Sequence, residues 1–192
     1  MKEKFLQWSE NAANHRHAMR TLFWVSFIES SLSPFPVYFL VLFILAHKVQ
    51  HSWQKVALVA TVSSVLGGLL GYIIGFYFFT TIGQSLLDFY HFQEQFNNFG
   101  NSLKENQFWI LTLASMTPIP YKIITIASGV FAINIPLFLL TSILGRGLKY
   151  FIVAYVTQKY SIKVKEAMLE TFWSTVIIFL IILFVIFYFL LK

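Results

Sequence analysis

The sequence predicts an all-α integral membrane protein with two opposing re-entrant helical hairpins and about three transmembrane helices in an inverted repeat. Three observations favour this fold class. Of the 192 residues, 57% are hydrophobic and 11% are charged, whereas about 25% of the residues of a soluble domain are charged. The apolar residues gather in blocks long enough to cross a bilayer. A Pro-x-Pro pattern interrupts two of these blocks, at Pro34–Pro36 and at Pro118–Pro120.

Two apolar blocks carry no charge and reach the length of about 20 residues that a transmembrane helix needs. They are Val56–Thr80 and Thr171–Leu191. A further helix is predicted over Pro136–Thr157, because proline is favoured at the start of a helix. We expect residues 1–20 to form a polar, amphipathic N-terminal segment, 21–158 a membrane domain, and 159–192 a basic loop with the C-terminal helix.

The two interrupted blocks predict hairpins. Each proline removes a backbone donor and blocks the regular helix, at a cost of about 3 kcal/mol or more. In hydrocarbon, such a break is tolerated only where protein or a water-filled cavity surrounds it. Matched interruptions in the two halves of a chain are typical of transport sites near the bilayer midplane. We therefore predict hairpins at about residues 21–46 and 108–133, in a membrane transporter.

The charge distribution supports a first hairpin that turns back. If it does, the basic residues on either side of it share the cytoplasmic side, as the positive-inside rule requires: Lys2, Lys4, Arg16, Arg20, Lys48 and Lys55. The connection over Thr81–Gln107 is acidic on balance and amphipathic, which suits the outer interface. Lys159, Lys163 and Lys165 then return to the inside. Because the net charge of +6 is dispersed in this way, nucleic acid is not an expected partner.

Four ionisable side chains lie within apolar blocks: Glu29, Lys122, Arg146 and Lys149. A charge at a transmembrane helix centre costs at least about 2.5 kcal/mol, so it usually faces the bundle interior and marks a substrate or proton path. The three cations are candidate ligands for a phosphate head group, together with Tyr38 and Tyr121 after the two breaks. Glu29 is a candidate for proton or ion coupling. Alternatively, the charges pair to hold the hairpins together, and Lys149 extends to the cytoplasmic interface.

Small residues recur every fourth position in the first full helix, at Ser63, Gly67, Gly71 and Gly75. Such stripes let backbones approach closely, so these glycines and Gly129 are predicted packing positions, with a substrate groove as the alternative. The chain has no cysteine, and its histidine pairs lack a third ligand, so no metal or cofactor is predicted. Glu29 is the only carboxylate within a span, and no Ser-His arrangement is evident, which disfavours an enzyme.

Three motifs resemble a known family. They are Ser115-Met116-Thr117-Pro118-Ile119-Pro120-Tyr121-Lys122, then Ala127-Ser128-Gly129-Val130, and then Leu144-Gly145-Arg146-Gly147-Leu148-Lys149-Tyr150-Phe151. With Glu29 upstream of Pro34-Phe35-Pro36, the chain resembles the DedA superfamily, also called the VTT or SNARE-associated Golgi protein family, and in particular its YqaA-like branch. The resemblance covers about Leu22 to Tyr155, which is most of the chain.

The resemblance implies two opposing re-entrant hairpins in the inner membrane and translocation of undecaprenyl phosphate or phospholipids, coupled in some members to a proton or sodium gradient. We therefore expect a multi-pass inner-membrane flippase or scramblase whose partners are membrane lipids, with a homo-oligomer left open. The alternative is a non-transporting protein for envelope organisation or membrane protein assembly. The chain departs from the commoner pattern: Ser115 and Tyr121 stand where arginines flank the central proline, and Lys122 lies one step further on.

Overall fold

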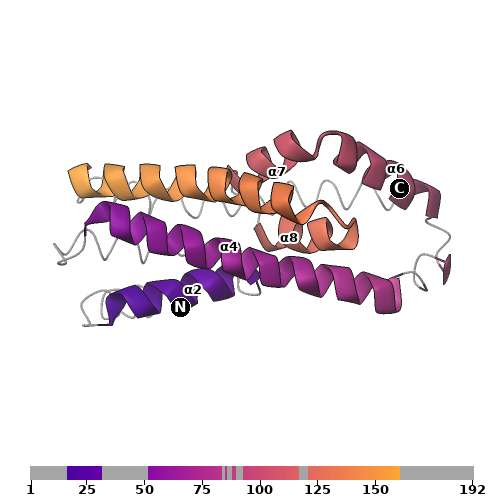
Figure 1. Cartoon of the computed structure of the whole chain (residues 1–192), viewed down its shortest axis with the longest axis horizontal. Coiled ribbons are helices and arrows are strands. Elements are labelled where there is room, and N and C mark those ends of the chain that lie inside the picture. The colour runs from indigo at the N-terminus through magenta and orange to yellow at the C-terminus, as the bar shows by residue number, and fades with distance from the viewer. Residues whose placement is uncertain are drawn as a thin grey trace, which may run out of the picture.

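The computed structural model describes residues 17–31, 52–83, 85, 88–89, 93–116 and 121–160. Within these ranges the regular secondary structure is helical throughout, and Figure 1 shows the longer helices lying side by side along one axis. The predicted all-α class is thereby confirmed for the described part of the chain. The predicted helix Thr171–Leu191 lies outside the described residues, as do Pro34, Pro36 and Tyr38.

Two long antiparallel helices organise the bundle. Helix α4 (Trp53–Phe78) continues into a π-helical turn, η1 (Phe79–Gly83). A second helix, Ile135–Tyr160, runs in the opposite direction. The start of α4 lies beside the end of this helix, where Trp53 contacts Tyr155, and Tyr72, further along α4, contacts Phe138 near its start. Both helices are long and apolar enough to cross a membrane. They confirm the helices predicted over Val56–Thr80 and Pro136–Thr157, each extended by a few residues.

The second of these helices begins where its sequence predicts. The side-chain Oδ1 of Asn134 accepts a hydrogen bond from the backbone N–H of Leu137 at 3.1 Å, and its carbonyl accepts one from Phe138 at 2.9 Å. An asparagine that satisfies a free N–H group of the first turn is a common N-cap. Pro136 follows within the first turn, where its missing donor leaves no intrahelical bond unmade.

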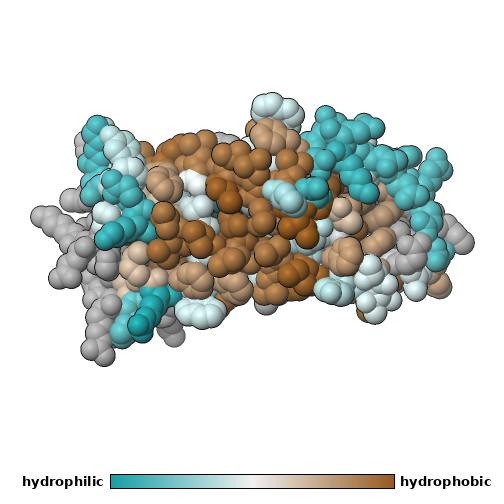
Figure 2. Space-filling model, in the orientation of Figure 1, coloured by the Kyte–Doolittle hydropathy of each residue, from teal (hydrophilic) through white to brown (hydrophobic). Residues whose placement is uncertain are grey.

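Large apolar side chains are exposed around the middle of the bundle. On α4 and on Ile135–Tyr160 they are between 44% and 56% exposed, at Leu58, Val62, Leu66, Ile143, Leu148 and Ile152. On the face that it draws, Figure 2 shows these residues as an apolar belt, with hydrophilic residues gathered at the two ends. A continuous apolar surface of this kind is unfavourable in water and matches lipid. The surface is that of a membrane protein.

Helix α2 (Ala18–Ser31) lies parallel to α4 and ends beside its middle. The backbone carbonyl of Phe27 faces Gly67, and that of Ser30 faces Gly71. In Figure 1 both helices start at the same end of the molecule. Ser31 therefore lies near the middle of the bundle, whereas Ser52 lies at the end of the molecule where α2 begins.

Three shorter helices follow α4: α6 (Gln93–Glu105), α7 (Gln107–Met116) and α8 (Tyr121–Val130). Of these, α8 packs along the second half of α4. Along α6 and α7 the chain approaches the middle of the bundle. Gly100 of α6 packs on Phe131, just before the Ile135–Tyr160 helix begins, whereas Ser115 of α7 contacts Gly145, near the middle of that helix. Helix α8 runs back parallel to α4, with Tyr121 near Gly68 and Gly129 near Tyr72. The chain thus reverses between α7 and α8; Pro118 and Pro120 lie outside the described residues.

Glycines allow these helices to touch through their backbones. A Cβ atom at Gly67 would collide with the carbonyl of Phe27, one at Gly75 with that of Ile126, and one at Gly129 with that of Tyr72. At Gly71 it would collide with the side chain of Thr125 instead. Close backbone approach through small residues is a main source of helix association in lipid. The four glycines predicted as packing positions therefore lie at helix contacts.

Helix α8 ends in a turn that directs the chain into the next helix. The N–H groups of Ala132 and Ile133 donate to the carbonyls of Gly129 and Ser128, at 3.0 and 2.9 Å. Ala132 adopts a φ of 47°, the left-handed conformation that such a helix end requires. The hydroxyl of Tyr72 donates to the carbonyl of Ile133 at 2.7 Å, which ties this turn to α4.

Candidate functional site

Arg146 is the buried charge at the centre of the bundle. It lies midway along the Ile135–Tyr160 helix and is 3% exposed. Its guanidinium carbon lies 4.0 Å from the centroid of the Tyr121 ring, a close cation–π contact. Its Nη1 donates to the hydroxyl of Tyr150 at 3.4 Å and its Nη2 to that of Ser30 at 3.5 Å. Both bonds are longer than the usual 2.9–3.0 Å or so, and therefore weak.

Hydroxyl groups from four helices surround this guanidinium. The Oγ atoms of Ser30 on α2 and Ser64 on α4 are hydrogen-bonded at 2.7 Å. The hydroxyl of Tyr121 on α8 donates to Ser142 at 2.5 Å, and Tyr150 hydrogen-bonds to Ser64. Each of these hydroxyls shares a hydrogen bond with another hydroxyl, and those of Ser30 and Tyr150 also accept from Arg146. The result is a polar chamber within an otherwise apolar bundle.

The guanidinium keeps donor capacity in this chamber. Its Nε is buried and has no hydrogen-bond partner among the residues that the structure describes. A guanidinium carries five N–H donors in a planar fork. Because a buried donor without a partner costs about 1–3 kcal/mol, this arrangement favours an acceptor that binds through two oxygens. Phosphate and carboxylate groups have this geometry.

Two further charges lie near Arg146. Lys149 is partly buried one turn further along the same helix and lies within the electrostatic field of Arg146. Glu29 on α2 interacts electrostatically with Lys149 and with Tyr150. The structure therefore brings together two predicted cations and the predicted coupling carboxylate, from two helices. With Arg146 and Lys149 against Glu29, the described charges of this group leave an excess of one positive charge.

Lys122 is the neighbour of Tyr121, whose ring contacts the guanidinium of Arg146. It lies in the first turn of α8, next to Tyr121, and is partly buried. Its carbonyl accepts a hydrogen bond from the hydroxyl of Thr125 at 2.9 Å. Within the described ranges, no contact joins its ammonium to Arg146. Tyr121 itself, the other predicted residue here, is buried under the guanidinium.

Four residues of the chamber were not among the predicted site residues: Ser30, Ser64, Ser142 and Tyr150. A signal for two of them was available, because Ser142 and Tyr150 lie four residues before and after Arg146 and so share its helix face. Ser30 and Ser64 carry no such signal. Serines are common where transmembrane helices pack, and only the packing of α2 against α4 joins them.

The sequence pattern of the VTT domain matches residues 33–159, which include both proline pairs and all three predicted cations. This chain belongs to the DedA family. Among the relatives of this DedA protein is a protein of Haemophilus influenzae described as uncharacterized, 29% identical over 196 residues and covering 100% of this chain and 96% of the relative. No solved structure matches the chain.

A second relative of the DedA protein comes from Histophilus somni and is likewise described as uncharacterized. It is 32% identical over 184 residues, covering 94% of this chain and 93% of the relative. The relatives therefore extend along nearly the whole DedA protein, beyond the matched domain at both ends. Glu29 lies outside residues 33–159, whereas Tyr121 and Arg146 lie within them. DedA proteins are generally regarded as membrane proteins without enzymatic activity.

Proposed function

We propose that this DedA protein translocates an anionic lipid across the inner membrane, as a flippase or scramblase, and that Arg146 binds the phosphate head group. One observation carries the proposal: Arg146 is buried at the centre of the bundle, and its Nε has no hydrogen-bond partner among the residues that the structure describes. A buried cation in a membrane domain is costly, so it is usually retained for a substrate or ion path. Phospholipids and undecaprenyl phosphate both present the phosphate oxygens that a guanidinium binds.

Chain direction supports two re-entrant hairpins that meet at this site. Helix α2 starts at the end of the molecule where α4 starts, and it stops beside the middle of α4. Helices α7 and α8 approach the middle from the other end and leave it again. Opposed hairpins of this kind, as an inverted repeat, give alternating access from the two sides of a bilayer. The proline pairs Pro34–Pro36 and Pro118–Pro120 are the proposed breaks.

The remaining predicted residues receive roles around Arg146. Lys149 and Lys122 add positive charge, and Tyr121 lines the chamber. Tyr38, the other predicted ligand, lies outside the described residues. Glu29 competes with the anion for the cations, or binds the proton whose transfer is coupled to transport. In this proposal residues 21–158 form the multi-pass transport domain, and the lipid is the partner. A homo-oligomer is compatible with these roles and is not needed for them.

Replacement of Arg146 tests the proposal. In proteoliposomes with a fluorescent anionic lipid, Arg146→Gln should reduce the rate of translocation about tenfold or more, since the charge-assisted bonds to phosphate are lost. Arg146→Lys should keep part of the rate, because a lysine supplies charge without the fork. The matched control is Lys55→Gln, which removes an exposed cation far from the chamber.

Unchanged translocation by folded Arg146→Gln protein would refute the assignment of the head group to Arg146. If purified wild-type protein moves no lipid at all, the alternative gains support: a non-transporting protein for envelope organisation or membrane protein assembly. In that case the chamber has a structural role and the charges hold α2 to the Ile135–Tyr160 helix. The thermal stability of Arg146→Gln, measured in the same detergent, shows whether loss of transport reflects loss of fold.

A further inference from the structure

A pocket of about 300 Å³ lies far from Arg146, where α6 packs on the ends of α4 and α8. Its walls differ in character. One wall is apolar and consists of Phe76 of α4, Phe79 of η1, Val130 and Phe131 at the end of α8, and Phe96 of α6. The other belongs to α6 and includes Asn97, Asn101 and Lys104. A pocket with one apolar and one cationic wall suits an amphiphilic anion.

The apolar wall is a stack of three aromatic rings. The ring of Phe96 on α6 stacks on Phe79, with centroids 4.9 Å apart, and on Phe131, with centroids 4.6 Å apart. Since the three rings come from three segments of the chain, the stack fixes α6 against the rest of the bundle. It gives the pocket a preformed apolar wall against which methylene groups pack.

The polar wall follows one face of α6. Asn97, Asn101 and Lys104 are spaced by four and three residues, so their side chains lie along one side of the helix. All three are exposed to solvent. Lys104 has no ion-pair partner within the described residues, and neither asparagine side chain is hydrogen-bonded there. The wall thus offers one ammonium group and two amide groups to a ligand.

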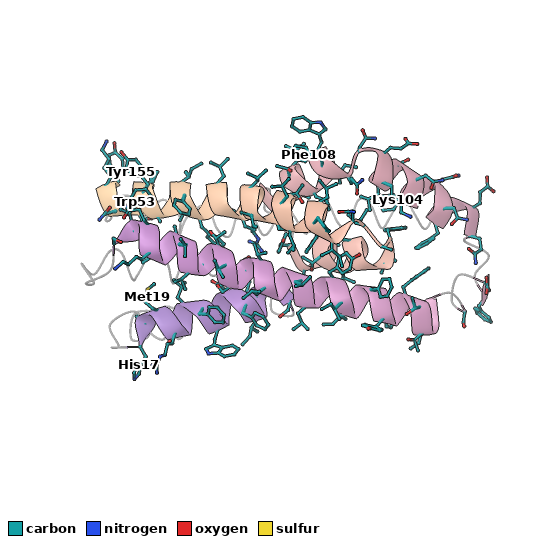
Figure 3. The ribbon with its side chains drawn as sticks, in the orientation of Figure 1. His17, Met19, Trp53, Lys104, Phe108 and Tyr155 are labelled. Carbon is teal, nitrogen blue, oxygen red and sulfur yellow. The ribbon has the colours of Figure 1, made fainter. Side chains whose placement is uncertain are left out.

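The pocket lies at the edge of the apolar belt. Figure 3 shows Lys104 at the end of the molecule opposite Trp53 and Tyr155, and Figure 2 shows α6 as part of the hydrophilic cap beside the belt. Ligand pockets typically measure about 300–1,000 Å³, so this one holds a head group with a few methylenes and not a whole lipid. The rest of an acyl chain would continue toward the apolar belt over exposed Phe76 and Ile73.

We propose that this pocket is an interfacial site for the phosphate head group of an anionic lipid, with Lys104 as its cation. It is separate from the chamber of Arg146 and does not depend on translocation, because a protein that moves no lipid could still hold one here. The aromatic stack selects against free phosphate, since only a lipid brings methylene groups to that wall.

The test uses the full chain in neutral detergent and a phosphatidylglycerol with a photoreactive group near its phosphate. Cross-linked peptides are identified by mass spectrometry. For the wild type, label should appear on α6. With Lys104→Gln, the concentration for half-maximal labelling should rise about tenfold, because a charge-assisted contact is lost. Lys55→Gln, a matched change at the opposite end of α4, should leave labelling of α6 unchanged.

Two further variants keep the test decisive. Asn101→Trp fills the pocket from an exposed helix position, so it should abolish labelling of α6 while the protein stays folded. Arg146→Gln should leave labelling of α6 intact even if it abolishes translocation, which separates this site from the transport proposal. Equal labelling of wild type, Lys104→Gln and Asn101→Trp would overturn the inference. Competition by inorganic phosphate as strong as that by unlabelled lipid would overturn the choice of a lipid.

Discussion

Among single residues, Tyr121 makes the main contact that stabilises the buried guanidinium of Arg146. The two hydrogen bonds of Arg146 to protein hydroxyls are 3.4 and 3.5 Å long, near the limit of a useful bond. The face of Tyr121 lies 4.0 Å away, and a cation–π contact shielded from solvent is worth about 2 kcal/mol. A tyrosine at this position therefore stabilises a cation supplied by another helix. This is the position at which the commoner family pattern places an arginine of its own.

Two substitutions separate the ring of Tyr121 from its hydroxyl. Tyr121→Phe keeps the aromatic face and loses the bond to Ser142, which should lower the free energy of unfolding by about 1 kcal/mol. Tyr121→Leu also removes the face and should cost about 3 kcal/mol. Thermal unfolding in detergent micelles measures both. Equal losses for the two variants would show that the hydroxyl, and not the cation–π contact, carries the stabilisation.

Among the helices, α2 and α8 both pack on α4 through close backbone contacts. Gly67 and Gly75 on α4, and Gly129 on α8, each face a carbonyl group of another helix. Backbone atoms have no rotamer with which to avoid a side chain, so these contacts tolerate no Cβ atom. The same contacts bring Ser30 to Ser64, and Tyr121 beneath Arg146. Helix packing and assembly of the polar chamber therefore depend on the same residues.

Replacement of Gly129 should be among the most destabilising single changes in the described bundle. A Cβ atom there meets the carbonyl of Tyr72 and the N–H of Phe76, so Gly129→Ala should lower the free energy of unfolding by about 3 kcal/mol. The control is Gly147→Ala, whose Cβ would lie 3.6 Å from Thr61 Cγ2, an ordinary contact. It should stabilise by up to about 1 kcal/mol, because alanine is the better helix former. Similar melting temperatures for the two variants would contradict the packing described here.

The whole molecule is an apolar belt between two hydrophilic ends. Figure 1 places the start of α4 at one end and α6 at the other, and Trp53 and Tyr155 pair near the first end. Aromatic side chains are enriched where a membrane protein meets the head groups. In the proposed orientation the Trp53 end is cytoplasmic, and α6 with its pocket faces the outer interface.

Cysteine labelling tests this orientation in a chain that has no native cysteine. Ser52 and Ser102 are both exposed, at the start of α4 and within α6. A membrane-impermeant maleimide added to intact spheroplasts should label Ser102→Cys, and should label Ser52→Cys only after the membrane is permeabilised. Permeabilised cells provide the control that both thiols are accessible. Labelling of both positions from one side would refute the proposed membrane orientation.

Local properties of the chain were predictable. Val56–Thr80 and Pro136–Thr157 were recognised from hydropathy and a helix-start pattern, because a span is defined by its own residues and the lipid around it. The chain reverses between α7 and α8, within the range of the hairpin predicted from the prolines; the re-entrant hairpin itself stays a prediction. The composition of the polar chamber did not follow, since Ser30 and Ser64 meet only through the packing of α2 on α4.

Composition and hydropathy alone indicate a membrane protein, show that prolines interrupt two of its apolar blocks, and identify Arg146 as a charged residue within an apolar block. Each is a property of a short segment and its solvent. Helix packing, by contrast, brings Tyr121 under Arg146 and makes α6 close a pocket with Lys104 on its wall. The reason is physical: glycine contacts between distant segments set how deeply the helices pack, and that depth decides which side chains meet.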